Sequence, residues 1–229
     1  MKWISDLLDI IFPRYCAVCG ETLSHTEEHI CLNCLYQMPR IEKARKQEIE
    51  KLFWGTIPVE RATSFMYYRK GSPYNNLLHQ IKYKAHPETA TYIAAMAAAE
   101  LFEEGFFDGI DIIVPLPLSR KKERLRGYNQ SDYIAKGLSQ KSGIPIIRNA
   151  IQRTVANETQ THKNRDERWK NVEGIFAVTK PEELQGKHIL LVDDVLTTGA
   201  TIASCAKCIC TLPDTKISLF TLAYSYNRI

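Results

Sequence analysis

The sequence predicts an α/β domain with a mostly parallel sheet of about five strands flanked by helices, preceded by a small four-cysteine finger. Strand-like apolar runs alternate with helical segments along the chain, which is typical of parallel sheets. The most apolar runs end at charged or polar residues, as buried parallel strands do where ligands bind. The chain has 229 residues, 45% of them hydrophobic, which suffices for one core and a small appendage.

Two CxxC pairs near the N-terminus predict a zinc site. They are separated by eleven residues, and the expected metal ligands are Cys16, Cys19, Cys31 and Cys34. Each pair presents two thiolates from one tight turn, and two such turns complete a tetrahedral S₄ site, which favours Zn²⁺. Such a closed site is structural and stabilises a segment too small to bury its own core. The alternative is four free buried thiols or a redox pair.

The first twelve residues, MKWISDLLDIIF, predict a short amphipathic helix. Its apolar run contains Asp6 and Asp9, is too short to span a bilayer and has no cleavage site, so it is not read as a signal peptide. We expect this helix to pack on the chain's own body rather than on a membrane. We therefore expect a cytoplasmic protein without membrane insertion, whose cysteines stay reduced or bind metal.

The chain is expected to divide into residues 1–55, holding this helix, the finger and a charged helical linker at Ile41–Lys51, and residues 56–229, the main domain. The main domain begins with a strand at Arg61–Tyr68, a turn and a helix at Tyr74–Tyr83. The aromatic residues here allow two interpretations, stacking on a nucleobase or packing in the core; they are Tyr67, Tyr68 and Tyr83.

The remaining elements alternate as the fold class requires. A buried Ala-rich helix is followed by a second apolar strand and then by a basic turn, PLPLSRKKERLRGYNQ. The predicted helices are Thr91–Phe102, Gln130–Lys141 and Ala200–Cys210, and the predicted strands are Asp111–Val114, a short one near Ile146, Gly174–Val178, Ile189–Val192 and Lys216–Ala223. Cys205 and Cys208 share a face of the last helix and are interpreted as small buried hydrophobic residues rather than metal ligands.

The stretch ILLVDDVLTTGAT, residues 189–201, is the most informative in the chain. Four apolar residues lead into two carboxylates, Asp193 and Asp194, at the end of a buried strand. Small hydroxyl residues and Gly199 follow at the start of a helix, where unpaired N–H groups and a partial positive charge favour an anion. Carboxylates beside such an anion site suit the hydroxyls of a sugar whose phosphate occupies it.

Positive charge is concentrated in the middle of the chain. Residues 119–170 carry 13 Lys and Arg against 5 Asp and Glu, a net +8, whereas the whole chain has only +4 and the remainder therefore sums to −4. This asymmetry indicates a polyanionic ligand such as pyrophosphate, or nucleic acid. A solvated basic surface is the alternative.

The segment VDDVLTTGAT resembles the phosphoribosyl pyrophosphate (PRPP) binding motif of the type I phosphoribosyltransferases. The PLP-type turn, the RGYNQ segment and the four-cysteine finger together resemble the ComF-like (competence protein F) branch of that family. The resemblance implies the type I phosphoribosyltransferase fold and PRPP as ligand. The residues it assigns to PRPP are Asp193, Asp194, Val195, Leu196, Thr197, Thr198, Gly199, Ala200 and Thr201, with Leu118, Ser119, Arg120, Lys121 and Arg165.

The resemblance also implies a reaction, the displacement of pyrophosphate from the ribose. Asp193 and Asp194 would hold the ribose hydroxyls, while Arg120 and Lys121, with Mg²⁺, would stabilise the departing pyrophosphate. These four residues are the catalytic candidates. The polar segment Arg153–Lys170 matches the family's mobile loop, with Arg153, Thr154, Gln160, Arg165 and Asn171 at its pattern positions.

The acceptor is left open by the sequence, which allows a base or another amine. A small hood built from Arg61–Tyr83 is expected to select it. Other members of the family imply a role in DNA uptake during natural competence. Two rival functions follow, a PRPP-binding regulator without turnover, and a protein that handles single-stranded DNA or contacts the competence machinery.

Overall fold

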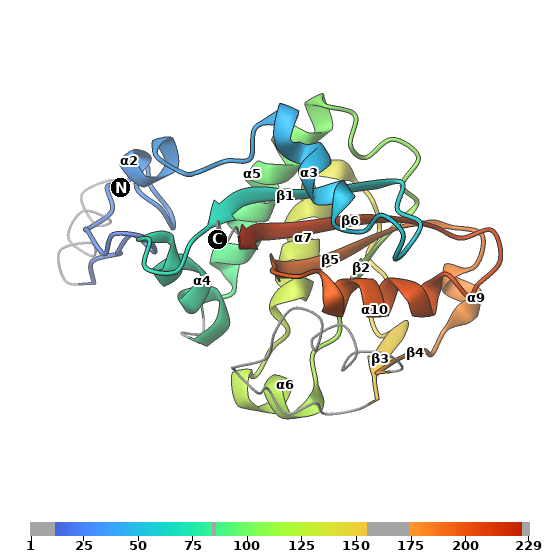
Figure 1. The fold of residues 1–229 in the computed structure, drawn as a ribbon. Helices are drawn as coiled ribbons and strands as arrows, with labels where there is room; N and C mark the ends of the chain where they lie inside the picture. The colour runs from blue at the N-terminus through green and yellow to red at the C-terminus, as the bar shows by residue number, and fades with distance from the viewer. Residues whose placement is uncertain (1–11, 84–85, 155–174, 226–229) are drawn as a thin grey trace.

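The computed structural model describes residues 12–83, 86–154 and 175–225. An α/β domain holds most of these residues, and a small cysteine-rich ribbon lies at one end of it (Figure 1). The helix expected at residues 1–12 falls outside the described residues except for its last position. Most of the predicted loop Arg153–Lys170 falls outside them too.

The main sheet has four parallel strands in the order β1-β6-β5-β2. Their bounds are β1 Arg61–Tyr68, β2 Ile112–Pro115, β5 His188–Leu196 and β6 Lys216–Ser225. The strand predicted near Ile146 is reduced to one parallel bridge with Ile113, so the described sheet has four full strands rather than about five. The predicted α/β class with a mostly parallel sheet is confirmed.

A second, two-stranded sheet pairs β3 (Ile151–Arg153) with β4 (Phe176–Val178) in antiparallel fashion. The two strands flank residues 155–174 in sequence, and β4 corresponds to the strand predicted at Gly174–Val178. Arg153 pairs with Phe176 in this ladder. The start of the predicted loop is therefore fixed by a strand.

Helices cover both faces of the main sheet, as a parallel sheet requires (Figure 1). On one face, Leu190 and Val192 of β5 share a core with three helices, α4 (Tyr74–Tyr83), α5 (Glu88–Glu103) and α7 (Gln130–Ser142). On the other face, Ile189 and Leu191 share a core with α3 (Lys46–Lys51), α9 (Pro181–Leu184) and α10 (Ala200–Ile209). The run Ile189–Val192 is fully buried because it has strands on both sides and helices on both faces.

The close approach of α5 and α7 depends on small residues. Alanines of α5 are buried against α7, and Gly137 of α7 lies directly over them. A Cβ atom at Gly137 would lie 2.2 Å from the backbone oxygen of Thr91, far inside contact distance. No side chain larger than a hydrogen atom fits at this crossing.

The prediction of a hood at Arg61–Tyr83 is wrong for its first half. Residues 61–68 form β1, which pairs in parallel with β6 from Arg61↔Ser218 to Tyr68↔Ser225 and so belongs to the main sheet. Its loose alternation of apolar residues suits an edge strand covered by helices as well as it suits a separate hood. Only α4 remains near the carboxyl-terminal edge of the sheet, where it contacts the site described below.

The linker and the basic turn are more ordered than the sequence suggested. The segment predicted as a charged linker forms η1 (Lys43–Arg45) and α3, and it buries Ile41 and Ile49 against the sheet. The basic turn after β2 forms a helix, α6 (Arg120–Arg126), capped by the Ser119 hydroxyl, which accepts from the Lys122 N–H. The division between residues 55 and 56 stays a prediction.

Candidate functional site

The four cysteines of the ribbon converge on one point. Their Sγ atoms all lie within 4.8 Å of one another, and those of Cys19 and Cys31 are 3.8 Å apart. Zinc bonded to four sulfurs at about 2.3 Å places neighbouring sulfurs about 3.8 Å apart, so the cluster fits a tetrahedral zinc ion. The short helix α2 (Leu32–Tyr36) supplies Cys34, and the preceding turn supplies Cys31. The predicted structural zinc site is confirmed by this geometry.

The surroundings of Cys16 favour a thiolate, which is the form that binds zinc. Burial acts to raise the pKa of Cys16, but backbone N–H groups of Cys19, Cys31 and Val18 outweigh it and lower the pKa to about 7. His29, which lies between the two CxxC pairs, instead meets the Thr89 hydroxyl through Nδ1 at 3.2 Å. The four thiolates therefore form the site without a histidine.

The ribbon is fixed to the α/β domain by hydrogen bonds to α4. The Tyr74 hydroxyl donates to the backbone oxygen of Cys34 at 2.7 Å, and the Asn76 amide donates to that of Val18 at 3.1 Å. Tyr74 is buried, and α4 places both residues in its first turn. The zinc ribbon thus packs against the helix that leads to the carboxyl-terminal edge of the sheet.

Asp193 and Asp194 lie near the end of β5 and are held by donors from other elements. The strand continues to Leu196, because β6 stays paired with it, whereas β2 stops at Pro115 beside Val192. Asp193 Oδ1 accepts from the Ser131 hydroxyl at 3.2 Å and from the Asp194 N–H at 2.8 Å. Both carboxylates thus lie beyond the point where β2 leaves the sheet.

Asp194 is buried and has two charged or polar partners. Its side-chain Oδ2 accepts from Gln130 Nε2 at 3.0 Å and pairs with Lys82 Nζ at 3.1 Å. Gln130 is the first residue of α7, and Lys82 lies in the last turn of α4. The sequence placed Lys82 only in a basic cluster, and it pointed to Gln130 only as part of the RGYNQ segment and not at all to Ser131. Each of these residues lies more than 60 residues from the acid that it contacts, so local patterns could not reveal the contact.

The surroundings of Asp193 disfavour its ionised form. Burial first, and the neighbouring Asp194 carboxylate second, raise the pKa of Asp193 to about 7, although the Asp194 N–H, Lys82 and Ser131 act in the opposite direction. A carboxyl group that titrates near neutrality at the edge of a parallel sheet is typical of a functional site rather than of a purely structural one.

The segment after β5 forms an open helix start. Gly199 is the N-cap residue of α10 at φ +78°, and no side chain caps it within the described chain. Thr197 is exposed, Thr198 and Thr201 are half-buried, and the Thr198 hydroxyl accepts weakly from the Ala200 N–H at 3.4 Å. First-turn N–H groups with this little capping are suited to bind a phosphate.

Gly199 is required on structural grounds as well. Its positive φ disfavours any side chain, and a Cβ atom there would lie 2.9 Å from the ring of Phe53. Phe53 is buried and follows α3, so the segment just after α3 packs against the N-cap residue of α10. Of the neighbouring motif residues, Leu196 and Ala200 are buried and Val195 is half-buried, which gives them packing roles.

The assignment of Arg120 and Lys121 to the pyrophosphate stays a prediction, and the structure shows how far each residue of this segment is exposed. Arg120 and Lys121 are exposed, Ser119 is used as the cap of α6, and Leu118 is half-buried. Lys122 is half-buried instead, and its pKa is lowered by burial and then by the nearby charges of Arg153 and Arg126. Lys82 pairs with Asp194 and Arg153 lies near Asp193, while Arg126 reaches Asp194 through Gln130. Lys122 lies near these three cations.

Arg126 contacts both Gln130, which bonds to Asp194, and the exposed ring of Tyr83. Its Nη1 donates to Gln130 Oε1 at 2.7 Å, and its guanidinium lies 5.0 Å from the centroid of the Tyr83 ring. Gln130 in turn donates to Asp194. Of the three tyrosines considered for stacking, Tyr67 packs on Tyr224 and Tyr68 on the core, while Tyr83 is 56% exposed.

Arg153 and Thr154 are the described part of the predicted mobile loop; Thr154 is exposed, and its backbone N–H donates to the Ile175 oxygen at 2.9 Å. Arg153 is the one of the two that lies near the acids. It is half-buried, its guanidinium lies 5.6 Å from the Phe176 ring centroid, and its Nε has no hydrogen-bond partner within the described chain. Burial lowers the pKa of Arg153, and Asp193 acts against that shift. Gln160, Arg165 and Asn171 lie outside the described residues. Cys205 is fully buried, as expected of a core residue.

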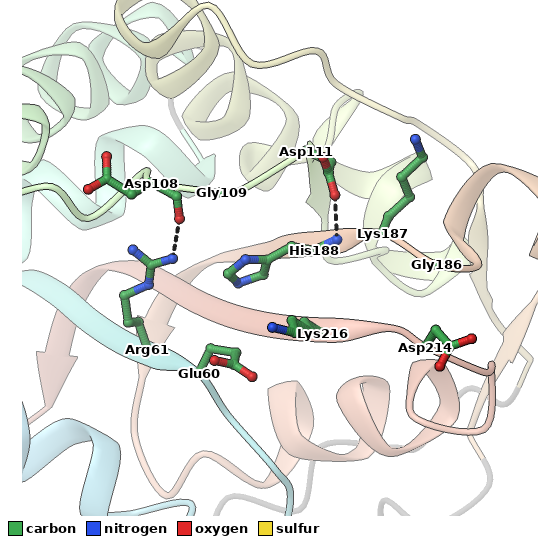
Figure 2. A pocket seen from close by; sticks show the side chains of 10 residues that line it. All are labelled: Glu60, Arg61, Asp108, Gly109, Asp111, Gly186, Lys187, His188, Asp214 and Lys216. Atoms are coloured by element: carbon green, nitrogen blue, oxygen red, sulfur yellow. Dashed lines mark hydrogen bonds between the residues drawn. The ribbon is translucent and has the colours of Figure 1, made fainter.

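A different pocket lies at the opposite edge of the sheet, where β1, β5 and β6 begin. Figure 2 shows its mixed charges, with Arg61 bonded to the backbone oxygen of Asp108 and the His188 N–H donating to Asp111 at 2.8 Å. This cavity of about 350 Å³ contains none of the predicted site residues. The acids, the α10 start and the cations near them all belong to the carboxyl-terminal edge.

Family comparison agrees with this geometry. The family model described as the phosphoribosyl transferase domain matches residues 80–212, more than half of the chain. The chain belongs to the phosphoribosyltransferase family. A second family model, the double zinc ribbon domain, matches residues 7–45 and so includes all four cysteines. The predicted fold of a phosphoribosyltransferase domain with an N-terminal zinc ribbon is confirmed.

Curated relatives place this chain in the ComF-like branch of the family, as the resemblance predicted. The "Competence protein ComFC" of Bacillus subtilis is 30% identical over 200 residues, 86% of this chain and 78% of the relative. The "DNA utilization protein YhgH" of Escherichia coli K12 is 30% identical over 196 residues, 84% of this chain and 76% of the relative. "Competence protein F" of Haemophilus influenzae is 28% identical over 93% of this chain and 85% of its own length.

Among solved structures, the chain is similar to glutamine PRPP amidotransferase from B. subtilis, with 15% identity and a TM-score of 0.40. The match covers 63% of this chain and 30% of the amidotransferase chain. Within the described residues, none of the helices combines the length and the apolar character needed to cross a bilayer.

Proposed function

We propose that the chain binds PRPP and transfers its phosphoribosyl group to a base or amine acceptor with release of pyrophosphate. One observation carries this proposal. Two adjacent acids at the end of β5 lie next to an uncapped helix start, and cations from α4, α6 and β3 surround them. A phosphorylated sugar with a pyrophosphate group offers hydroxyls, a phosphate and a polyanion to these three features.

The acids are assigned to the ribose. Asp193 and Asp194 would accept hydrogen bonds from the ribose hydroxyls and stabilise the positive charge that develops on the sugar ring as pyrophosphate leaves. Ser131 and Gln130 hold the two carboxylates in place, so little reorganisation is needed when the charge appears. The residues Thr197, Thr198, Gly199, Ala200 and Thr201 would receive the 5-phosphate.

The pyrophosphate is assigned to the basic residues beside the acids. Lys122 and Arg126 lie one helical turn apart on the half-buried face of α6, so both can contact one leaving group, whereas exposed Arg120 and Lys121 would act at longer range. Arg165, in the segment 155–174, is retained as a candidate from the family pattern. Arg153 is a further candidate because its Nε has no partner among the described residues.

Magnesium is proposed as the partner ion of PRPP. Carboxylate oxygens are ligands of the class that Mg²⁺ prefers, and Asp193 and Asp194 supply them at the carboxyl-terminal edge of the sheet. Asp194 Oδ2 already accepts from Gln130 and Lys82, which supports contact of the acids with a hydrated ion carried by PRPP rather than a dedicated protein site. When bound, Mg²⁺ would neutralise part of the pyrophosphate charge.

The biological role is proposed from the relatives. Their names, competence protein and DNA utilization protein, support a place in the handling of incoming DNA. A cytoplasmic location is proposed because reduced thiolates are needed to hold the zinc. A second candidate function, binding of single-stranded DNA or of a competence protein without turnover, is favoured by exposed apolar and aromatic side chains on the ribbon, Leu32 and Tyr36.

Thermal unfolding tests the ligand. PRPP with Mg²⁺ should raise the melting temperature, as expected when a ligand binds only the folded state. The double variant Asp193→Asn with Asp194→Asn should lose that shift, while Asp214→Asn, which removes an acid at the opposite edge, should keep it. An equal shift in all three proteins would remove the ribose role of the acids.

Product analysis tests turnover. Pyrophosphate release that depends on an added base or amine supports the transferase. A release rate that never exceeds hydrolysis of PRPP across a broad panel of acceptors would favour the regulator. A labelled oligonucleotide, titrated with and without PRPP at two salt concentrations, then separates a shared anion site from an independent DNA surface.

A further inference from the structure

The helix α4 has the zinc ribbon at one end and the acid pair at the other. Its first turn bonds to the ribbon through Tyr74 and Asn76, and its last turn carries Lys82, which pairs with Asp194 at 3.1 Å. Eight residues separate Tyr74 from Lys82, which is about 12 Å of helix. One rigid element therefore joins the metal centre to the site.

Both ribbon contacts involve the zinc-binding turns themselves. Val18 lies between Cys16 and Cys19, and Cys34 is one of the four cysteines of the site. The Tyr74 side chain is buried, so its hydrogen bond to Cys34 is shielded from water and restricts the helix strongly. The position of α4 thus depends on the folded, metal-binding form of these turns.

At the far end of α4, Lys82 is placed where its charge affects both acids. Its side chain is one-quarter exposed, and it shares Asp194 Oδ2 with the Gln130 amide. Tyr128 also fixes this end, since its hydroxyl donates to the backbone oxygen of Ile81 at 2.6 Å. The groups that face the acid pair are Lys82 from α4, Gln130 and Ser131 from α7, Arg153 from β3 and Cys205 from α10.

We propose that Lys82 is a positioning residue for PRPP, and that the zinc ribbon sets its position through α4. This inference rests on the proposed function for its ligand. Lys82 orients Asp194 through their ion pair and places a positive charge beside the acid pair where the ribose hydroxyls would bind. The ribbon then acts as a structural support of the PRPP site in addition to its own folding.

The test uses the full zinc-loaded chain and measures PRPP affinity by calorimetry with Mg²⁺ present. Lys82→Met should weaken PRPP binding tenfold or more, and Lys82→Arg should restore part of it. Tyr74→Phe, which removes only the hydroxyl that contacts Cys34, should weaken binding about threefold with unchanged zinc content. The matched control is Thr89→Val, which cuts the ribbon's hydrogen bond to α5 and leaves those to α4 intact; it should stay within twofold of the unmodified protein.

A double-mutant cycle identifies the route. If Tyr74 acts through Lys82, Tyr74→Phe should have no further effect on PRPP affinity once Lys82→Met is present. Full additivity of the two substitutions would overturn the proposal, as would a loss in Thr89→Val equal to that in Tyr74→Phe. The acid limb of the affinity–pH profile should also move to higher pH in Lys82→Met, which general loosening of the fold would not produce.

A ligand-free measurement separates this inference from the proposed function. The titration of the Asp193 carboxyl, followed by carbon-13 NMR, should move to higher pH in Lys82→Met and less far in Tyr74→Phe, but not in Thr89→Val. If PRPP fails to bind the unmodified protein, the proposed function falls, and this titration still decides the link from ribbon to acid pair. Unchanged titration in both Lys82→Met and Tyr74→Phe would refute the link.

Discussion

Replacing Asp193 by Asn should stabilise the fold at neutral and alkaline pH. Its pKa is raised from the ordinary 3.8 to about 7 by burial and by Asp194. Between these two values the unfolded chain has lost the proton that the folded chain still holds. The free energy of unfolding of the unmodified protein therefore falls as pH rises through this window. Asn carries no charge at any of these pH values, so the variant lacks this loss.

The magnitude follows from the width of the window. Each pH unit within it changes the free energy of unfolding by about 1.4 kcal/mol, so the full window corresponds to about 4 kcal/mol. Between pH 5 and pH 8 the variant should gain about 2 to 3 kcal/mol relative to the unmodified protein. Asn can still accept from the Ser131 hydroxyl and the Asp194 N–H through Oδ1, but its amide brings a new donor that costs about 1 kcal/mol if unpaired.

Urea unfolding followed by circular dichroism, at several pH values between 5 and 8.5 with zinc present, measures this difference. Titrating groups far from Asp193 contribute equally to both proteins and cancel when the two curves are subtracted. Asp214→Asn, which removes a carboxylate at the opposite edge of the sheet, is the control, and a pH-dependent change common to both variants is not assigned to Asp193. If the difference in the free energy of unfolding between Asp193→Asn and the unmodified protein is independent of pH, or shrinks as pH rises, the pKa of Asp193 is not raised in the folded protein and the reasoning is refuted.

Three further predictions concern other parts of the chain. Gly137→Ala should lower the free energy of unfolding by more than about 3 kcal/mol, because its Cβ would lie 2.2 Å from a backbone oxygen of α5. Gly143→Ala, at φ +75° with open space around it, should lower it by about 1 to 2 kcal/mol. Denaturant titration compares the two variants. A chelator should release one zinc per chain, scored with a colorimetric dye, and Cys34→Ser should lower both zinc content and melting temperature. Lys122→Met should weaken PRPP binding about tenfold and Arg120→Met less than threefold in calorimetry, since only Lys122 is half-buried beside the other cations.

Local patterns predicted the parts of the fold that local patterns determine. The run Ile189–Val192 forms a buried strand, and the helix after Gly199 begins at Ala200 as expected, because both depend on residues adjacent in sequence. The two CxxC pairs bring their sulfurs together for the same reason, since each tight turn positions its own two thiolates. The family motifs then supplied the meaning of these elements, which periodicity alone could not.

Long-range contacts were beyond the reach of such patterns. Arg61–Tyr68 reads as a strand in the sequence, but only its pairing with β6, more than 150 residues away, places it in the main sheet rather than in a hood. The spacing of charges in residues 120–126 did not reveal a helix capped by Ser119, so the half-buried Lys122 could not be separated from exposed Arg120. The four-residue spacing of Lys122 and Arg126 was the available signal, because it places the two side chains on one face of a helix.

The placement of the two acids follows from a mismatch in strand length. β2 stops at Pro115, beside Val192, while β6 continues alongside β5 as far as Leu196. The two acids are therefore held in register by a ladder on one side, and on the other side they face donors from α4 and α7 instead of a strand. A strand of ordinary length at β2 would cover this edge, and hydrophobic residues in place of the acids would stabilise it. The fold instead keeps two adjacent carboxyl groups here, one buried and one half-buried, and this costs free energy that the packed cores on both faces of the sheet offset.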